Sequence, residues 1–562
     1  MDFVLALHSH LPWVLNHGRW PHGSDWLCEA AMDTYLPLLE ELEALALEDV
    51  PAPVTIGFTP VLANQLASPE FTAELEEFFA HRLASCEEAE RDLRARGADE
   101  LVALVGFWRA RMERLRARYR DDGSDLVAAF RRLEDQGRLE IMGSAATHGF
   151  LPLLGRDESI RLQLALGRFE HKRLFGRLPR GCWLPECAYR PRGEWAPLPD
   201  APVRGIRRGI DEHLGDAGFG YFFTDAHMAH AGQPFFASPE LHGEPARRHH
   251  GPAHPVPSEA PTRSPYRSYR ILTGRSGQHL AALVRDPRSS ARVWSRSEGY
   301  PGDEWYLEFH KIRWPGGLKL WRVSGPGSDL GAKQHYEPAR ARARAAEHGR
   351  HFAGVLSDTA AGESDTREAV VAAPFDTELF GHWWFEGPEF LGAAYRALQG
   401  ETAVRAVTAS CHLANHPPRS ALRLAAGSWG ADGDWSMWLN PETEWTWRRL
   451  WPLESAFWDA APRALATPAL RPILAQATRA LLLAQSSDWQ FIISTGVVED
   501  YAVRRFNGHC EELALLLAPL QAADGEGIEQ GQRLAEALAA RDSLFPDVLP
   551  AVEQALRGSR GF

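Results

Sequence analysis

Short apolar runs recur along this 562-residue chain, and a polar residue or a turn follows each of them. The runs lie at residues 3–7, 54–58, 139–143, 182–185, 221–224, 280–284 and 370–375. Between several of them, as at residues 25–48 and 158–176, apolar residues recur with the period of an amphipathic helix. Continuous apolar strands that alternate with helices predict a parallel sheet covered by helices. Seven such strands favour a closed barrel over an open sheet.

The polar residues just beyond these strands form a second pattern. In a parallel barrel the carboxyl ends of the strands face one another, and active sites are built at that end. We therefore expect polar residues that are far apart in sequence to converge there. They are His8, His10, Ser144, His148, Glu186, Asp225, Asp286 and Asp376.

Two carboxylates in this set have tryptophan neighbours. Glu186 lies in WLPECAYRP (183–191), and Asp376 lies in FDTELFGHWWFEG (375–387). Glycoside cleavage requires one carboxylate that attacks or stabilises a sugar cation and another that protonates the leaving oxygen. The residues also allow a simpler interpretation, in which Glu186 forms an ion pair with Arg190 or Arg192.

Composition and charge narrow the classes of partner. The net charge is −13 and the pI about 6.0, which argues against a nucleic-acid-binding surface. No stretch approaches the roughly 20 apolar residues of a membrane span. The six cysteines include no CxxC pair, which favours reduced thiols in a cytoplasmic protein. We expect a globular protein with a neutral substrate and no nucleic-acid or membrane partner. Its oligomeric state is left undetermined.

The chain contains 20 tryptophans, several of them in loop-like surroundings. An indole offers a flat face and one N–H group, which suit a sugar ring and its hydroxyls. Trp383 and the set Trp429, Trp435 and Trp438 lie among Gly, Asp and Ser residues. Both interpretations stay open for them: sugar-stacking platforms or large core residues.

His8 and His10 allow a different chemistry. They are two residues apart, so an extended chain places them on the same side. An HxH pair at the end of a first strand is also found in metal-dependent amidohydrolases and deacetylases. A metal-dependent carbohydrate deacetylase is therefore the alternative from another class.

Four motifs together resemble the sequence regions of glycoside hydrolase family 57. They are LHSHLPWV (7–14), WLPECAYRP, FDTELFGHWWFEG and SSDWQFIISTG (486–496), and their order and spacing also match. The resemblance runs from residue 3 to about residue 510. Within the family, the wording of the motifs is most similar to that of the 1,4-α-glucan branching enzymes.

The resemblance implies a (β/α)7 barrel, a TIM-barrel variant with one unit fewer. The residue pattern adds an inserted helical hairpin, because residues 72–134 are charged, amphipathic and nearly free of Pro and Gly. It also adds a helical C-terminal domain at 415–562. The expected catalytic barrel then comprises residues 1–71 and 135–414. Residues 231–268, rich in Pro, His and Arg, are expected to form a long loop.

The resemblance also implies roles for individual residues. Glu186 would be the nucleophile and Asp376 the general acid/base of a retaining double displacement, with no cofactor and no metal. The expected sugar contacts are His8, His10, His148, Trp183, Tyr266, Trp294, His382, Trp383, Trp429, Trp438 and Asp488.

The implied activity is α-glucan branching. The enzyme would cleave an α-1,4 link in amylose or a glycogen-like polymer and pass the fragment to a 6-hydroxyl, forming an α-1,6 branch in glycogen biosynthesis. The 231–268 loop, through Tyr266 or Tyr269, is the candidate cover that keeps water away. A same-family α-amylase or 4-α-glucanotransferase remains an alternative, because such enzymes share the two carboxylates.

Overall fold

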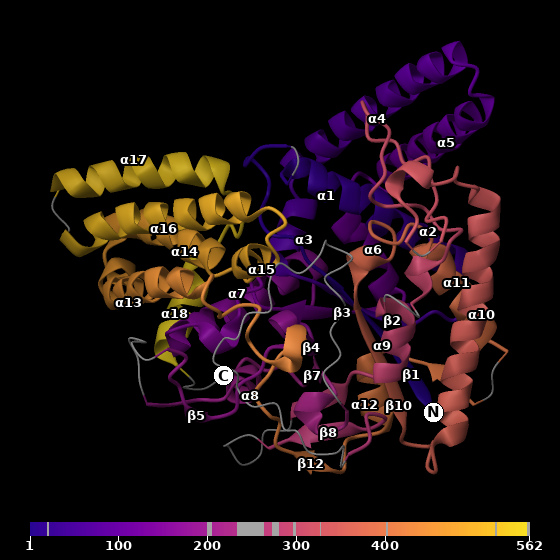
Figure 1. The fold of residues 1–562 in the computed structure, drawn as a ribbon. Helices are drawn as coiled ribbons and strands as arrows, with labels where there is room; N and C mark the ends of the chain where they lie inside the picture. The colour runs from indigo at the N-terminus through magenta and orange to yellow at the C-terminus, as the bar shows by residue number, and fades with distance from the viewer. Residues whose placement is uncertain are drawn as a thin grey trace.

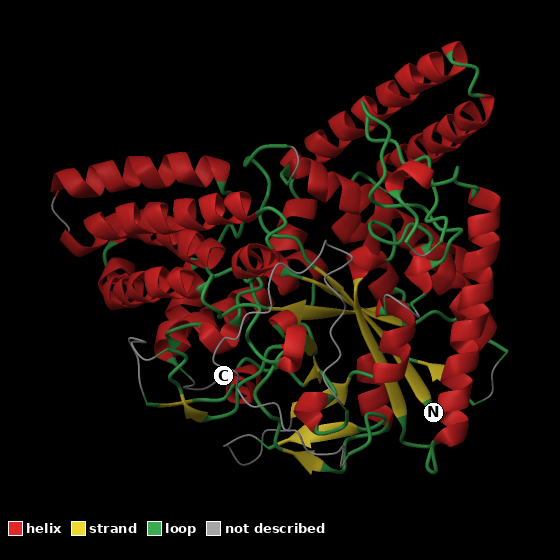
Figure 2. Cartoon of the chain, viewed as in Figure 1, coloured by secondary structure: helices red, strands yellow, loops and turns green. Residues whose placement is uncertain are grey.

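Seven parallel strands form the centre of the molecule in the computed structural model (Figures 1 and 2). The structure describes residues 1–19, 22–198, 205–232, 263–272, 280–295, 299–325, 327–400, 403–522 and 525–558. In sheet order the seven strands are β10 (Val370–Asp376), β1 (Asp2–Ser9), β2 (Val54–Phe58), β3 (Leu139–Ser144), β4 (Gly181–Trp183), β7 (Tyr221–Thr224) and β9 (Leu280–Val284).

The two ends of this row of strands meet. Just beyond β9, Arg285 forms a parallel bridge with Ala372 of β10, and the Asp286 N–H donates to the Ala372 carbonyl at 2.8 Å. The apolar side chains of these strands are almost all buried, as continuous apolar runs require. The prediction of a (β/α)7 barrel is confirmed.

Helices cover the outside of the barrel, as Figure 2 shows. Residues 25–48 were expected as one helix, but a π-helical turn (Ala31–Tyr35) separates α1 from α2. Helix α7 ends at Phe175, because Gly176 adopts a left-handed φ of 79° at its C-cap. The covering helices are α1 (Ser24–Ala30), α2 (Leu36–Leu47), α3 (Pro60–Leu66), α6 (Leu126–Asp135), α7 (Asp157–Phe175), α8 (Ile210–Asp216), α9 (Pro287–Trp294), α10 (Pro338–Gly362), α11 (Gly387–Leu398) and α12 (Ala409–Asn415).

The inserted hairpin consists of α4 (Pro69–Ala95) and α5 (Asp99–Asp121). The two helices pack against each other and project from the barrel at the upper right of Figure 1. Helix α6, which was expected within the hairpin, packs instead on α7 and β3 of the barrel.

Helices α13 to α18 form a C-terminal layer, seen at the left of Figure 1. Indole N–H groups fasten this layer to the barrel: Trp451 donates to the Leu153 carbonyl at 2.9 Å, and Trp458 donates to Ser159 Oγ at 2.8 Å. The helices are α13 (Glu444–Ala466), α14 (Arg471–Ala484), α15 (Asp488–Thr495), α16 (Glu499–Ala522), α17 (Gly525–Arg541) and α18 (Leu549–Arg557).

Most of the long loop lies outside the described residues, which resume at 263. Next to it, β8 (Ser268–Ile271) pairs antiparallel with β9, on the edge of β9 that does not face β7. The short β12 (Ala421–Leu422) pairs in turn with β8. Elsewhere β11 (Arg405–Ala406) pairs with β1, and β5 (Gly193–Glu194) pairs with β6 (Ile206–Arg207).

The six cysteines are all unpaired. Within the described ranges, no helix combines the length and the apolar composition that crossing a membrane requires.

A glycine on α7 allows this helix to lie close to the end of β3. A Cβ added at Gly167 would be 2.2 Å from the Ser144 carbonyl oxygen. We expect Gly167→Ala to lower the free energy of unfolding by about 1–3 kcal/mol, because helix and strand must move apart. The measurement is the midpoint of thermal unfolding at a fixed scan rate.

Gly354 on α10 is a matched control, because a Cβ there would meet no heavy atom within 4 Å. Gly354→Ala should leave stability unchanged or raise it by up to about 1 kcal/mol, since Ala favours a helix more than Gly does. Equal melting midpoints for both variants would contradict the close approach of α7 to β3.

Candidate active site

The carboxyl ends of the strands bring the predicted residues together. In the pairing of β1 with β10, His8 lies directly opposite Asp376. In the pairing of β3 with β4, Ser144 lies opposite Trp183, three residues before Glu186. The residues after β1, β3, β4 and β10 therefore meet at one end of the barrel, as the pattern of polar residues predicted.

Glu186 is held by residues from the C-terminal part of the chain. The Trp429 indole N–H donates to Glu186 Oε2 at 2.9 Å, and the Ser487 hydroxyl donates to Oε1 at 3.2 Å. The backbone is also fixed, because the Trp429 N–H donates to the Glu186 carbonyl at 3.0 Å. His148 Nδ1 lies 3.6 Å from Oε1. The carboxyl group is thus oriented from three sides.

The backbone of Glu186 is in the left-handed region, with a φ of 60°, and Cys187 follows with a φ of 48°. Residues other than glycine adopt this conformation at a cost, which surrounding contacts must offset. Here the contacts from Trp429 and Ser487 do so.

The simpler interpretation of Glu186 as part of an ion pair is wrong. Arg192 donates both of its hydrogen bonds to Glu212, at 2.7 and 2.8 Å. Arg190 is buried, and its guanidinium nitrogens have no hydrogen-bond partner among the described residues. Neither arginine neutralises Glu186.

Burial shifts the protonation of both carboxyls. It raises the pKa of Glu186 to about 7; the Trp429 hydrogen bond opposes this shift, and the charge of Asp376 adds to it. Burial also raises the pKa of Asp376 to about 8, and the neighbouring Glu378 adds to this rise while Arg285 opposes it. Asp376 therefore lies close enough for its charge to raise the pKa of Glu186.

Glu378 belongs to the same cluster. Its Oε1 accepts hydrogen bonds from the His10 backbone N–H at 3.2 Å and from the Tyr35 hydroxyl. Burial raises the pKa of Glu378 to about 7, and these hydrogen bonds oppose the rise.

A histidine network lies between Glu186 and the C-terminal domain. His8 Nε2 and His148 Nε2 are 2.9 Å apart, and the rings of His10 and His148 stack with centroids 4.0 Å apart. Burial holds the pKa of His8 and of His148 well below the usual value. Both rings are therefore neutral at pH 7, so only one nitrogen donates across the 2.9 Å contact.

Asp488 completes this network. Its Oδ2 lies 2.9 Å from His10 Nε2 and also accepts from the Ser486 hydroxyl. Burial alone would raise the pKa of Asp488, but the charge and hydrogen bond of His10 hold it at about 2. His10, His148 and Asp488 offer ligand atoms that all lie within 4.8 Å of one another, so a metal ion could be held here. The metal interpretation rested on His8 and His10; of these two, His10 belongs to the group and His8 does not.

The predicted tryptophans fall into two groups. Trp183 and Trp429 lie at the site: Trp183 stacks on His8 at 4.7 Å and meets Trp429 edge-on at 4.9 Å. Trp438 is buried between Phe150 and Phe491, with ring centroids 4.6 and 6.3 Å away, so both of its faces are covered. Of the two interpretations left open, sugar-stacking platform or core residue, the structure favours the core residue for Trp438.

Trp294 lies beside the end of the strand that carries Asp376, and His382 and Trp383 lie in the segment that follows this strand. Trp294 packs on Phe375 at 6.4 Å, and its indole N–H is buried without a hydrogen-bond partner among the residues that the structure describes. Trp383 lies half-buried beside Phe309 and the buried His382, both at 6.1 Å.

Tyr266 lies elsewhere. Its carbonyl accepts from the Val370 N–H at 3.1 Å, at the amino end of β10, and burial, together with the charge of Asp286, raises the pKa of its hydroxyl. Six residues separate Val370 from Asp376, about 20 Å in a strand. Tyr269 is buried and its hydroxyl donates to the Ser264 carbonyl at 2.7 Å. The structure does not bring either tyrosine together with the two carboxyls.

Some members of the site were not anticipated. The Ser487 hydroxyl donates to Glu186, and Thr59 Oγ1 lies 2.9 Å from His10 Nδ1. The charge of Arg285 lowers the pKa of Asp376. Thr59 and Arg285 directly follow strands, so the rule that polar residues after strands converge could have found them. Ser487 lies in the SSDW motif, but nothing in the spacing indicates which residue of that motif faces Glu186.

Comparisons with known proteins identify two regions of the chain. The profile of glycosyl hydrolase family 57 matches residues 4–425, and the profile of the C-terminal region of 1,4-alpha-glucan branching enzymes matches residues 453–552. The chain is 36% identical to a 1,4-alpha-glucan branching enzyme of Thermococcus kodakarensis over 97% of its own length and 77% of that protein.

Two solved structures are similar over nearly the whole chain. A family 57 branching enzyme from Thermococcus kodakaraensis, crystallised with glucose, superposes with a TM-score of 0.87 at 35% identity, covering 98% of this chain and 96% of that one. The alpha-amylase AmyC from Thermotoga maritima gives a TM-score of 0.79 at 26% identity, covering 100% and 99%. The profile match over residues 4–425, together with these relatives, shows that the chain belongs to glycosyl hydrolase family 57.

Proposed function

We propose that this protein is a 1,4-α-glucan branching enzyme, a retaining transglycosidase that acts on α-glucan. One observation carries this function: the 36% identity with a branching enzyme extends over 97% of the chain, so it includes the C-terminal region as well as the barrel. The amylase alternative shares the barrel and the carboxyls. The match of residues 453–552 to the C-terminal region of branching enzymes favours branching.

In this proposal Glu186 is the nucleophile. Its carboxylate attacks the anomeric carbon of an α-1,4-linked glucose while Asp376 gives its proton to the departing glycosidic oxygen. The product is a covalent glycosyl-enzyme and a shortened chain. The 6-hydroxyl of an acceptor chain then loses its proton to Asp376 and attacks the same carbon. This second step releases Glu186 and creates the α-1,6 link.

The order of the two pKa values supports these roles. Glu186, with a pKa of about 7, ionises before Asp376, with a pKa of about 8. Between these values the ionised nucleophile and the protonated acid coexist, which is the combination that the first step requires.

The residues around the carboxyls suit sugar binding. We propose His8, His10, His148 and Asp488 as partners of sugar hydroxyls, with Trp183, Trp294, His382 and Trp383 as walls. Trp429 is the favoured candidate for controlling the acceptor, because its indole touches Glu186 and its side chain is only half-buried. The cover formed by the 231–268 loop stays a prediction, since residues 233–262 are not described.

Biological context completes the proposal. A branching activity would serve the synthesis of a glycogen-like polymer in the cytoplasm, which the six unpaired cysteines favour. We propose residues 1–71 and 135–414, together with α6, as the catalytic unit, with the rest of 72–134 as the hairpin and 415–562 as the helical domain.

The experiment that tests the function uses amylose as donor and acceptor. The product is debranched, and its chain-length profile is compared with that of the starting material, while proton NMR counts α-1,6 links. New α-1,6 links identify branching. Shorter linear chains alone would identify the amylase, and redistributed linear chains the 4-α-glucanotransferase.

Removing either carboxyl should abolish branching without unfolding the protein. We expect Glu186→Gln to lower the rate by about 10⁴-fold or more and Asp376→Asn by about 10²–10⁴-fold, since a nucleophile and a proton donor are lost. The exposed Glu194 offers a control, and Glu194→Gln should keep full activity. An amide variant with wild-type turnover would show that the wrong carboxyl was assigned.

The pH profile of activity should be bell-shaped. The acid limb follows protonation of Glu186 near pH 7, and the alkaline limb follows loss of the Asp376 proton near pH 8. Glu378→Gln should move only the alkaline limb, toward lower pH, because the charge of Glu378 helps to raise the pKa of Asp376.

Gln at position 378 can still accept from Tyr35 and His10, so the geometry is preserved. The measurement is kcat/KM against pH for the wild type, Glu378→Gln and the control Glu194→Gln. An alkaline limb that stays in place in Glu378→Gln would contradict the coupling between Glu378 and Asp376.

Branching should require no metal. The acid and the nucleophile account for the reaction, and His10 Nε2 already lies against Asp488 Oδ2. We expect full activity after prolonged dialysis against a chelator. Metal analysis of the dialysed protein checks that metal has been removed. Stoichiometric zinc whose removal abolishes activity, together with deacetylation of an acetylated glycan, would support the deacetylase alternative.

A further inference from the structure

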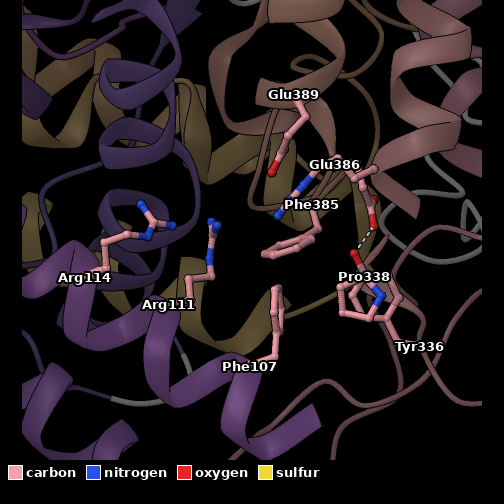
Figure 3. A pocket seen from close by; sticks show the side chains of 9 residues that line it. Phe107, Arg111, Arg114, Tyr336, Pro338, Phe385, Glu386 and Glu389 are labelled. Atoms are coloured by element: carbon pink, nitrogen blue, oxygen red, sulfur yellow. Dashed lines mark hydrogen bonds between the residues drawn. The ribbon is translucent and has the colours of Figure 1, made fainter. Parts of the chain in front are cut away.

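A small cavity lies where the inserted hairpin meets the barrel. Some of its lining residues belong to the hairpin, and others begin at Phe385, nine residues after Asp376 in the sequence. Helix α5 forms one wall, and the first turns of α10 and α11 form the others (Figure 3). The space between these walls, including open solvent at its mouth, is about 400 Å³. We call it the junction cavity; it is lined by Phe107, Arg111, Arg114, Tyr336, Pro338, Arg342, Phe385, Glu386 and Glu389.

Arg111 is the unusual residue of the junction cavity. Only 8% of it is exposed, yet Nε and Nη2 of its guanidinium have no hydrogen-bond partner among the described residues. Its guanidinium carbon lies 4.5 Å from the centre of the Phe385 ring. A buried cation with unused donors is costly, and such a group normally has an anionic partner.

The other charges leave room for an anion. Glu386 is buried, and burial raises its pKa to about 8, so it is protonated at neutral pH. Its Oε1 accepts from the Tyr336 hydroxyl at 2.6 Å and from the Leu307 N–H at 3.1 Å, while Oε2 is buried and has no partner in the described part of the chain. The protonated group therefore has a hydrogen to donate toward a ligand oxygen.

The rim of the cavity is also cationic. Arg114 and Arg342 are exposed residues that reach it from α5 and α10, and the half-buried Glu389 is the second carboxyl among the lining residues. Arg114 forms an ion pair with Glu40. The first turns of α10 and α11 add partial positive charge, which favours an anion in the same place.

Three aromatic rings shape the inner wall. Phe107, Tyr336 and Phe385 meet edge to face, with centroids 6.1–6.5 Å apart. They shield Arg111 from solvent, which strengthens its attraction for a charged ligand. Figure 3 shows Arg111 rising beside the rings of Phe107 and Phe385, with Tyr336 and Glu386 facing each other on the far side.

We propose that the junction cavity binds a phosphate group, either as free inorganic phosphate or as part of a sugar monophosphate. The two unused donor nitrogens of Arg111 donate hydrogen bonds to phosphate oxygens, and Arg342 lies over the ligand. The protonated carboxyl group of Glu386 donates a further hydrogen bond to the phosphate. Because the lining residues come from the hairpin and from two barrel helices, the bound anion would tie these parts together. Occupancy should therefore raise the thermal stability of the whole chain.

The test measures binding to the full-length protein, independently of glucan chemistry. Inorganic phosphate and a hexose monophosphate are titrated calorimetrically at constant ionic strength set by chloride, with glucose as the phosphate-free control. We expect saturable binding with a dissociation constant of about 1 mM or tighter, and a rise in the melting midpoint. Tighter binding of the monoester than of inorganic phosphate would identify a sugar monophosphate as the ligand, and equal binding would identify free phosphate.

Variants locate the binding. Arg111→Met keeps the length of the side chain but cannot donate, so affinity should fall by about tenfold or more. Arg342→Gln, at an exposed position, should weaken binding severalfold without affecting folding. Arg116→Met is the matched control: Arg116 also lies on α5 but pairs with Glu76, and binding should be unchanged.

Two outcomes would overturn the proposal. One is no saturable binding of either phosphate compound to the wild type. The other is binding that Arg111→Met and Arg342→Gln leave intact, which would place the phosphate elsewhere on the molecule. Since no glucan is present, failure here leaves the branching function untouched.

Discussion

The burial of carboxyl groups at the barrel mouth is the constraint on which the site depends. Removing an ionisable group from water disfavours its charged form, and this is the first cause of the raised pKa values of Glu186, Asp376 and Glu378. Such groups are tolerated only where donors compensate for the lost water. For Glu186 the donors are Trp429 and Ser487, and for Glu378 they are Tyr35 and the His10 backbone.

These contacts account for features that would otherwise be unfavourable. The left-handed backbone at Glu186 and Cys187 turns the chain sharply just after β4. His148 also has a positive φ, of 56°, and its carbonyl accepts from the Ser487 N–H at 3.1 Å. Strain of this kind persists where surrounding contacts over-determine the conformation. Here the same C-terminal segment stabilises both strained positions.

Much of the fold followed from local patterns. Buried parallel strands are continuous apolar runs, so β2, β7 and β9 were found with their bounds, and the polar residues beyond the strands identified Glu186, Asp376 and the histidines. Contacts that depend on tertiary packing did not follow. Trp438 occurs in a loop-like segment, but Phe150 and Phe491 cover both of its faces. Tyr266 was placed by analogy of loops, and the pairing that joins it to Val370 is not encoded locally.

The hydrogen bonds that hold Glu186 cross from the barrel to the C-terminal part of the chain. Trp429 and Ser487 belong to the region after residue 415, whereas Glu186 follows the fourth barrel strand. A barrel separated from this region would keep its two carboxyls but lose both donors to Glu186. The two parts therefore cannot be exchanged as independent modules. A chimera joined near residue 415 would combine a carboxyl group from one parent with hydrogen-bond donors from the other, so recombination between relatives is restricted to pairs that preserve this contact.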